Sequence, residues 1–173
     1  MQKLLIVIDM QNDFIDGTLG SPEAQGIVPH VLQRVSTFAG TVLFTQDTHA
    51  ANYLETQEGK NLPVPHCIRG SKGWELQSEL EKMRKTSPLL KTTFGSKDLG
   101  PLLLRLNEEN PIEEINFLGL CTDICVISNA LIAKAFLPEV PIRVDANGCA
   151  GITPKSHAEA LSVMKQNQIQ IDQ

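Results

Sequence analysis

Short apolar runs alternate along the chain with longer segments that have helical spacing. Residues 4–8 form a continuous apolar run, which is typical of a strand buried on both faces. Residues 27–38 instead place apolar side chains at helical intervals, and Gly40 follows the end of that segment. The same reading predicts strands over 4–8, 41–45, 89–91, 115–120, 140–144 and 169–171, and helices over 27–38, 74–84, 99–106, 126–136 and 156–166.

This alternation predicts an α/β fold: a three-layer, doubly wound, mostly parallel six-stranded sheet. Helices should cover both faces of the sheet, because right-handed crossovers place them there. The 173 residues contain no internal repeat and no linker, so we expect a single domain over residues 1–173. Residues 48–72 are polar and contain prolines, which predicts a long loop, and such loops are usually functional.

Composition and charge exclude several classes of partner. The net charge is -5 and the sequence pI is about 5.3, so there is no basic footprint for a nucleic-acid backbone. No apolar stretch approaches the roughly 20 residues that a membrane helix needs, and the N-terminus lacks the features of a signal peptide. We therefore expect a cytoplasmic protein whose partner is a small molecule. In that compartment its four cysteines should be thiols.

Chemistry-bearing residues follow four of the predicted strands. In doubly wound sheets the ligand site lies outside the carboxyl ends of the strands. Asp9, Asp47, Lys91 and the segment Cys121–Cys125 all occupy such positions. Taken alone, Asp9 is equally well an acid that caps the next turn, and Lys91 a solvated surface charge. Their convergence at one edge of the sheet is more informative than any one of them.

Cys125 is the strongest candidate for a nucleophile. It lies between a predicted strand and a predicted helix, where free amide groups and the helix dipole favour a thiolate. The same amides can hold an oxyanion during acyl transfer. A carboxylate such as Asp9 can accept the thiol proton, and an ammonium such as Lys91 can stabilise the thiolate.

Two motifs in this chain resemble those of a known family. Residues 9–14 read Asp-Met-Gln-Asn-Asp-Phe, and residues 119–126 read Gly-Leu-Cys-Thr-Asp-Ile-Cys-Val. Both are similar to signatures of the isochorismatase-like cysteine hydrolases, and the chain is closest in motif to the nicotinamidases and pyrazinamidases. The resemblance continues through Asp145–Ala146 and the stretch from Thr153 to Ala158. It therefore covers nearly the whole chain.

The resemblance implies a role for each residue of the candidate site. Asp9 would be the general base or proton shuttle, Lys91 its electrostatic partner and Cys125 the attacking thiol. The backbone N–H groups of Cys121 and Cys125 would form the oxyanion hole, next to a cis peptide bond between Leu120 and Cys121. The implied reaction is attack on an amide carbonyl, loss of ammonia and hydrolysis of a thioester.

A candidate metal site lies in and beside the predicted loop. Asp47, His49 and His66 are either ordinary loop residues or metal ligands, and the residues alone leave both readings open. The resemblance to nicotinamidases implies a divalent ion held by these three, with Glu58 as the fourth ligand and Glu55 as the second choice for that position. Mixed nitrogen and oxygen ligands suit zinc, and also manganese or iron.

The substrate is the least determined part of the reading. Phe14 and Leu19 match positions that line the ring site of nicotinamidases, but Pro63 stands where many relatives have an aromatic residue. Phe94 can substitute for it sterically. The implied function is hydrolysis of nicotinamide to nicotinic acid and ammonia. Two alternatives stay open: a metal-free amidohydrolase acting on another small amide or carbamoyl compound, and a non-enzymatic binding domain.

The remaining histidines and cysteines have structural interpretations. His157 is read as a structural or capping residue, and His30 as a surface or interface residue. Cys67 and Cys149 are read as packing thiols. Because relatives commonly self-associate, the resemblance also implies a homo-oligomer.

Overall fold

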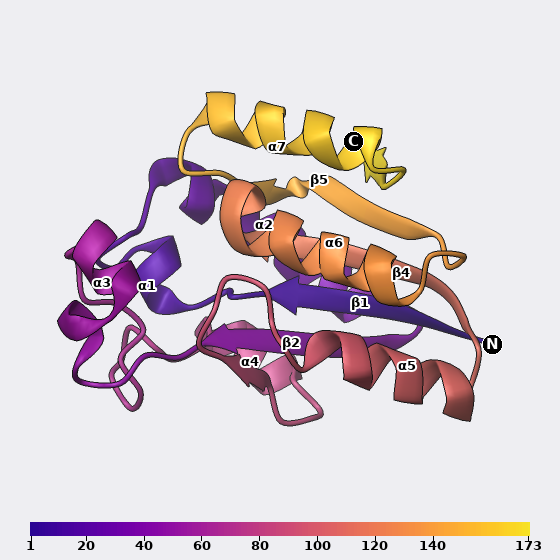
Figure 1. The fold of residues 1–173 in the computed structure, drawn as a ribbon, viewed down its shortest axis with the longest axis horizontal. Coiled ribbons are helices and arrows are strands. Elements are labelled where there is room, and N and C mark those ends of the chain that lie inside the picture. Colours follow the sequence, from indigo (N-terminus) through magenta and orange to yellow (C-terminus); the bar gives the residue numbers. More distant parts are fainter.

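Six strands that all run parallel form the centre of the computed structural model, which describes residues 1–173 (Figure 1). The strand order is β3-β2-β1-β4-β5-β6, so the chain winds outward from β1 in both directions. This confirms the predicted fold class. The strands are β1 (Gln2–Ile8), β2 (Thr41–Asp47), β3 (Leu89–Lys91), β4 (Ile112–Leu120), β5 (Ile142–Ala150) and β6 (Gln170–Asp172).

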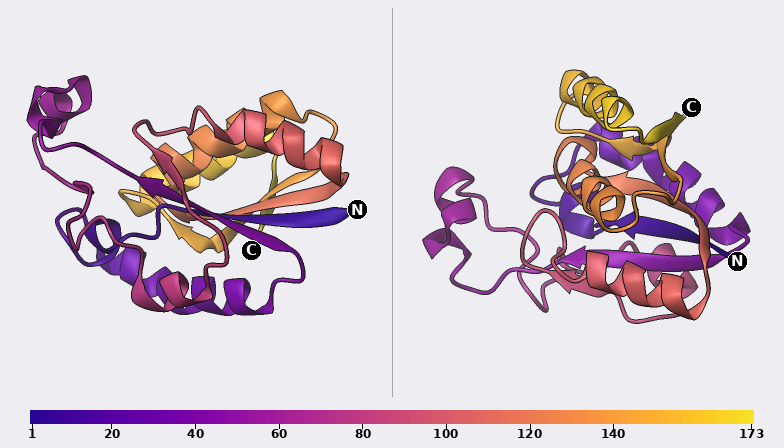
Figure 2. Two further views of the ribbon diagram at one scale, coloured as in Figure 1. Left: turned by 90° about the horizontal axis from the view of Figure 1, so that it is seen from below. Right: turned by 45° about the vertical axis from the view of Figure 1, so that its right-hand side comes forward.

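Helices cover both faces of the sheet and complete the three layers. One face carries α2 (Pro22–Thr37) and α4 (Ser78–Met83), and the other carries α5 (Leu99–Glu109), α6 (Ile127–Phe136) and α7 (Pro154–Gln166) (Figure 2). The shorter helices are α1 (Asn12–Ile15), η1 (Tyr53–Glu55), α3 (Gln57–Asn61) and the π-helical turn η2 (Thr122–Val126). None of the helices combines the length and the apolar character that a membrane crossing requires.

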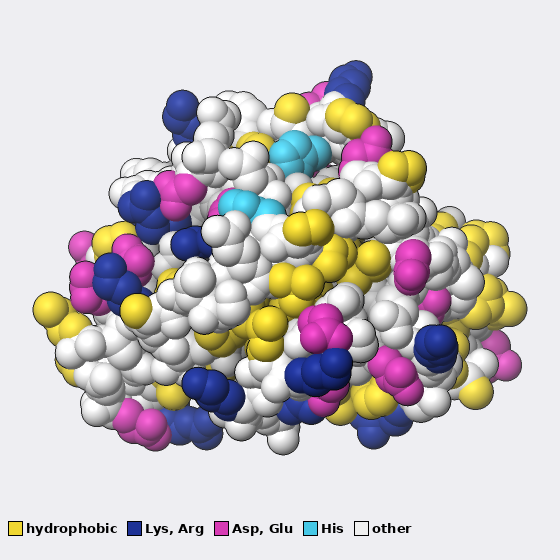
Figure 3. Space-filling view, turned by 180° about the vertical axis from the view of Figure 1, so that it is seen from behind, with side chains coloured by type: hydrophobic (Ala, Val, Ile, Leu, Met, Phe, Trp, Pro, Cys, Tyr) yellow, Lys and Arg dark blue, Asp and Glu magenta, His cyan; other side chains and the backbone are white.

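The hydrophobic core lies on both sides of the central strand β1. Leu4, Leu5, Ile6, Val7 and Ile8 have no exposed surface, as the uninterrupted apolar run predicts. The core continues into both helical layers. The outer surface of the α2 and α4 layer has basic and acidic side chains interspersed with apolar ones rather than sorted by sign (Figure 3).

Two helices begin four or five residues away from the predicted start. Helix α2 starts at Pro22 rather than at residue 27, because Ser21 accepts a hydrogen bond from Ala24 N and caps the helix. Helix α4 starts at Ser78 rather than at residue 74. The residues before it pair with the loop after β1 through an isolated antiparallel bridge between Gln11 and Leu76.

The long loop predicted over residues 48–72 is only partly irregular. It contains η1 and α3, which project beyond the carboxyl end of the sheet (Figure 1). Thr56 caps α3 by accepting a hydrogen bond from Gly59 N. The segment is therefore a structured arm above the edge of the sheet where the candidate residues lie.

Strands β1 and β4 approach each other closely at their carboxyl ends. Gly119 has φ +123°, and a Cβ atom there would lie 2.1 Å from Ile8 O, so no other residue fits. The peptide bond between Leu120 and Cys121 is cis, as the resemblance implied. In a sheet of this order the winding direction reverses between β1 and β4, which is where ligands bind in doubly wound folds.

Candidate active site

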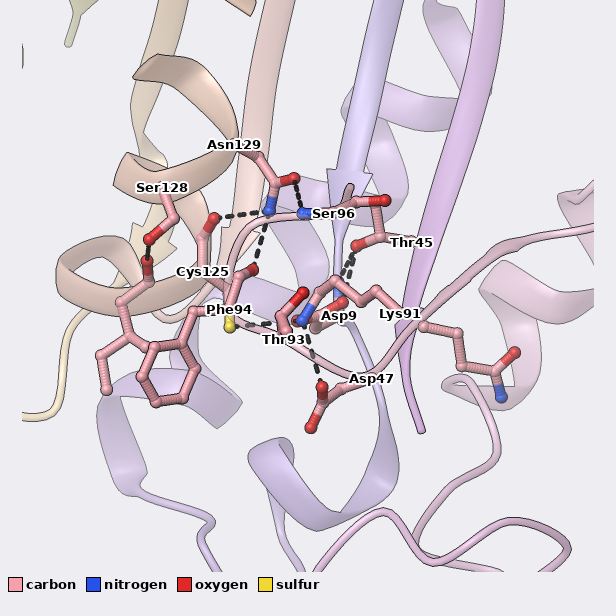
Figure 4. Close-up of polar contacts among 12 residues, drawn as sticks. Asp9, Thr45, Asp47, Lys91, Thr93, Phe94, Ser96, Cys125, Ser128 and Asn129 are labelled. Atoms are coloured by element: carbon pink, nitrogen blue, oxygen red, sulfur yellow. Dashed lines mark hydrogen bonds and ion pairs between the residues drawn. The ribbon is translucent and has the colours of Figure 1, made fainter. Parts of the chain in front are cut away.

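The carboxyl ends of four adjacent strands bring the predicted residues together. Lys91 ends β3, Asp47 ends β2, Asp9 follows β1, and the Cys121–Cys125 turn follows β4. Because neighbouring strands run parallel in the order β3-β2-β1-β4, these residues meet at one edge of the sheet. Figure 4 shows Asp9, Asp47 and Cys125 grouped around the Lys91 ammonium.

Lys91 lies at the centre of this group and contacts three other residues. Its Nζ atom is 2.6 Å from Asp9 Oδ2, 3.2 Å from Asp47 Oδ1 and 3.5 Å from Cys125 Sγ. All four residues are buried. A buried ammonium ion is stable only when it is paired, and two carboxylates supply that pairing here.

The surroundings tune the three groups in different directions. Burial raises the pKa of the Cys125 thiol, Asp9 raises it further, and Lys91 opposes both. Burial also raises the pKa of Asp9 above its usual range, although Lys91 counteracts this. For Lys91, burial disfavours the charge, but Asp9, Cys125 and Asp47 outweigh it and the pKa is raised. The arrangement therefore favours the protonated forms of the Cys125 thiol and of Lys91, and it increases the proton affinity of the Asp9 carboxylate.

Asp9 is held in place by its own backbone and by Thr45. Its φ angle is +46°, in the left-handed region that aspartate adopts more readily than most residues. Thr45 Oγ1 donates to Asp9 Oδ1 at 2.6 Å and accepts from Asp9 N at 3.1 Å. Asp9 Oδ1 is thus occupied by the hydroxyl, which leaves Oδ2 to face Lys91.

The turn that carries Cys125 is fixed from the side of α7. The Thr122 hydroxyl is 2.8 Å from His157 Nδ1, and Asp123 accepts from Ile152 N. His157 is thus a structural residue that contacts the nucleophile turn. The amide nitrogen of Cys121 donates to no protein acceptor, although its carbonyl accepts from two amides of the turn. An unpaired N–H at this position is available to a substrate oxygen.

The candidate metal ligands converge next to Lys91. Asp47, His49 and His66 are buried, and their ligating atoms lie within 4.8 Å of one another. Asp47 Oδ2 is 2.8 Å from His49 Nε2 and 3.7 Å from His66 Nε2. Glu58 Oε1 is 3.5 Å from each of the two Nε2 atoms, whereas Glu55 is exposed. The geometry therefore favours Glu58 over Glu55 as a fourth ligand.

The donor atoms of this cluster fit a metal ion. Nitrogen and oxygen ligands about 2.0–2.2 Å from a tetrahedral ion lie about 3.3–3.6 Å apart, and three of the four distances given above agree to within about 0.2 Å. His49 Nε2 is buried and faces the carboxylates of Asp47 and Glu58, two other candidate ligands. His66 Nδ1 lies 2.9 Å from Val64 O, a carbonyl that can only accept, so the Nε2 lone pair of His66 is free for a ligand.

Of the two predicted substrate-binding residues, Phe14 lies beside the candidate metal ligands and Leu19 packs against the core. The Phe14 ring lies 5.5 Å from the His66 ring, beside the candidate metal ligands. Leu19 is half-buried against the hydrophobic core, and Pro63 is exposed. Tyr53, which sequence reasoning did not single out, packs against the rings of His49 and His66.

Three other predicted residues have structural surroundings. His30 Nε2 contacts Asp145 Oδ2 at 2.9 Å, and its side chain is half-buried. Cys67 and Cys149 are buried, and all four cysteines are free thiols.

Sequence reasoning missed two side chains that organise the site. Gln11 is fully buried; its Nε2 atom donates to Asp47 O and Trp74 O, and its Oε1 atom accepts from Asp47 N. Asn129 is also fully buried and bonds Cys125 O. Gln11 lies inside the first motif, and Asn129 is four residues after Cys125 on one helix face, so both signals were present.

A buried thiol beside a carboxylate and an ammonium, at the carboxyl edge of a doubly wound sheet, is the arrangement of an enzyme with a cysteine nucleophile. The model of the Isochorismatase domain matches residues 3–172. The chain belongs to the isochorismatase family.

Known proteins of this family resemble the chain over its whole length. The crystal structure of nicotinamidase PncA from Bacillus subtilis shares 31% identity and a TM-score of 0.82, with 100% of each chain covered. The nicotinamidase/pyrazinamidase of Mycobacterium tuberculosis is 23% identical over 98% of this chain and 97% of its own length. The pyrazinamidase of Pyrococcus horikoshii in complex with zinc shares 24% identity and a TM-score of 0.80, covering 100% of this chain and 99% of that one.

Proposed function

We propose that this protein hydrolyses nicotinamide to nicotinic acid and ammonia through a thioester on Cys125. The observation that carries the proposal is the position of Lys91 Nζ, 2.6 Å from Asp9 Oδ2 and 3.5 Å from Cys125 Sγ. A base, a cation and a thiol in contact constitute an activated nucleophile. The likeness to the Bacillus subtilis nicotinamidase supports nicotinamide as the amide.

In the first half of the reaction the thiol attacks the amide carbonyl. Asp9 takes the thiol proton, a task suited to a carboxylate whose pKa is raised by burial. Lys91 stabilises the developing thiolate, and the N–H groups of Cys121 and Cys125 stabilise the oxyanion. Asp9 then gives its proton to the departing nitrogen, and the carbon–nitrogen bond breaks. Ammonia is released, and the acyl group remains on Cys125 as a thioester.

In the second half water cleaves the thioester. Asp9, again a carboxylate, accepts a proton from the water as the water adds to the thioester carbonyl. The carbon–sulfur bond of the tetrahedral adduct then breaks, Asp9 returns its proton to the Cys125 sulfur, and nicotinic acid is released. The N–H groups that hold the oxyanion in the first half hold it again here, because the carbonyl carbon stays bonded to Cys125 Sγ.

We also propose that Asp47, His49, His66 and Glu58 hold a divalent metal ion, with zinc favoured over manganese or iron. The convergence of their donor atoms, with His49 Nε2 facing Asp47 and Glu58, supports this. When bound, the ion would orient the ring nitrogen of the substrate, directly or through a water ligand. The same convergence favours metal binding over the metal-free alternative, in which the two imidazoles would serve only as ion-pair partners of Asp47 and Glu58.

Ammonia release from nicotinamide tests the proposal, with Cys125→Ala as the decisive variant. We expect the parent to release ammonia and Cys125→Ala to lose at least about 10³-fold in kcat. Cys149→Ala removes another buried thiol, on β5, and is the matched control that should retain activity. Ammonia release by Cys125→Ala at the parental rate would remove Cys125 from the mechanism, and no release by the parent would reject nicotinamide as the substrate.

Three further expectations from the sequence stay predictions: one domain over residues 1–173, a cytoplasmic location and self-association. Gel filtration with light scattering tests the last of these directly.

A further inference from the structure

Asp13 is a buried acid that takes no part in the proposed hydrolysis and is not one of the candidate metal ligands. Its carboxylate accepts hydrogen bonds from two backbone amides. Oδ2 accepts from Cys67 N at 2.7 Å, and Oδ1 accepts from Thr18 N at 3.4 Å. Hydrogen bonds to an ionised acceptor are shorter and stronger than neutral ones. The bond to Cys67 is therefore a firm contact between α1 and a segment 54 residues later in the chain.

The space around the Asp13 carboxylate is closely packed. A Cβ atom at Gly73 would lie 2.1 Å from Asp13 Oδ2, and one at Gly17 would lie 2.6 Å from Asp13 Oδ1. The backbone is fixed as well, because Asp13 N donates to Gly73 O at 3.0 Å. Packing at this density leaves a side chain little freedom to change its rotamer. The carboxylate is thus held in the orientation that meets the Cys67 amide.

Cys67 joins the two histidines of the candidate metal site through its backbone. It directly follows His66, and its carbonyl accepts from His49 N at 2.9 Å. Two residues further on, Arg69 N donates to His49 O at 2.9 Å, which completes an isolated parallel bridge between His49 and Ile68. The placement of the Cys67 backbone therefore sets the position of His66 relative to His49.

The backbone of Cys67 also has an unusual conformation. Its φ angle is +47°, in the left-handed region that residues other than glycine seldom adopt. Such a conformation persists only where the surrounding contacts hold it. The amide of Cys67 is held by Asp13, and its carbonyl by His49. Loss of the Asp13 bond would let Cys67 relax, and His66 would move with it.

We propose that Asp13 is a positioning residue that holds His66 and His49 in their ligating arrangement before a metal ion binds. This inference rests on the proposed metal site, because it concerns the same two histidines. Phe14, the next residue, adds a contact to the His66 ring, with the ring centroids 5.5 Å apart. Ligands that are already in place bind more tightly, since little of the binding energy is spent on ordering them.

Zinc affinity tests the proposal without any need for turnover, in a competition with a chromophoric chelator. Asp13→Ala should weaken zinc binding about 10–100-fold, the usual effect of losing a residue that supports a metal ligand. Asp13→Asn keeps an oxygen acceptor of the same size for Cys67 N and should stay within about fivefold of the parent. Ser71→Ala is the matched control: it removes a hydrogen bond to Trp74 N in the same segment and should leave the affinity unchanged.

Amide hydrogen exchange of the metal-free parent supplies a second measurement, which decides the matter even if Asp13→Ala does not fold. The Cys67 amide should exchange at least about 100-fold more slowly than in an unstructured chain before any zinc is added. Free exchange at Cys67 that slows only with zinc would overturn the proposal, because the histidines would then be ordered by the metal itself.

The affinities can also contradict it. Parental zinc affinity in Asp13→Ala would remove the positioning role. An equal loss in Asp13→Asn and Asp13→Ala would assign the effect to the charge of Asp13 rather than to its bond with Cys67, and would overturn the proposal as well. If the parent binds no zinc, the proposed metal site fails, while exchange at Cys67 still accepts or rejects Asp13 as the anchor of the His66 segment.

Discussion

Gln11→Ala should destabilise the protein strongly without touching any residue proposed to react. Gln11 is fully buried, and its amide accepts from Asp47 N at 2.7 Å and donates to Asp47 O at 2.8 Å. Its third hydrogen bond is donated to Trp74 O, which also accepts a hydrogen bond from Gln46 Nε2 and so keeps a partner in the variant. The substitution therefore leaves two buried backbone groups of Asp47 without these partners.

The magnitude follows from those two groups. A buried polar group that loses its partner costs about 1–3 kcal/mol, so Gln11→Ala should lower the free energy of unfolding by about 3–4 kcal/mol. For a chain of this length that corresponds to a fall of about 10 °C in Tm. Asn12→Ala, at the residue next to Gln11, is the control. It removes one exposed hydrogen bond to Lys72 O and should lower the free energy of unfolding by less than about 1 kcal/mol.

Urea unfolding with a chelator present is the appropriate assay, since bound metal would add its own stabilisation. A loss below about 1 kcal/mol in Gln11→Ala, equal to that of Asn12→Ala, would refute the reasoning. Water entering the vacated space and bonding both groups of Asp47 would produce that result.

Three further substitutions or treatments have defined outcomes. Thr45→Val removes the hydroxyl that donates to Asp9 Oδ1 and keeps a side chain of nearly the same shape. It should lower kcat about tenfold, measured by ammonia release. Chelation should lower Tm in the parent, and His49→Ala should carry less than about 0.1 metal ion per chain by elemental analysis, against about one in the parent. Burial lowers the pKa of His157 despite Asp123, so its stabilising effect is complete above about pH 6.5 and is lost as the pH falls through its folded pKa. The free energy of unfolding should therefore fall less steeply below pH 6.5 in His157→Asn than in the parent; parallel curves would count against this assignment.

The sequence carried enough information to place Asp9, Asp47 and Lys91, because each follows a short apolar run. A strand of that kind must be buried in a parallel sheet, and parallel strands present their carboxyl ends at one edge. The order of the strands was not needed for this prediction. The hydrogen-bonding partners were harder to predict, because Asn129 bonds Phe94 and Ser96 across more than 30 residues, and no local spacing encodes that contact.

The starts of the helices were missed for a different reason. Apolar periodicity marks where a helix packs, and the first turn of α2 has few apolar residues to contribute. The cap at Ser21, with Pro22 after it, was the available signal for that start. For α4 the periodicity extended too far upstream, because the segment of Trp74 and Leu76 pairs with the loop after β1 instead of forming a helix: Leu76 bridges Gln11, and Trp74 O accepts from Gln11 Nε2.

The charges of the site give a physical reason why the catalytic group (Asp9, Lys91 and Cys125) lies next to the candidate metal ligands. Asp47 Oδ1 lies 3.2 Å from Lys91 Nζ, and Asp47 Oδ2 lies 2.8 Å from His49 Nε2. One carboxylate therefore contacts both the catalytic lysine and the candidate metal ligands. Asp9 and Asp47 share the Lys91 ammonium, and Glu58 adds a third carboxylate beside the two histidines, so the carboxylates outnumber the ammonium. Uncompensated buried charge is costly. A divalent cation held by the two histidines, Asp47 and Glu58 would balance the excess. Lys91 would then remain paired chiefly with Asp9 and Cys125, which is the pairing that the proposed attack requires.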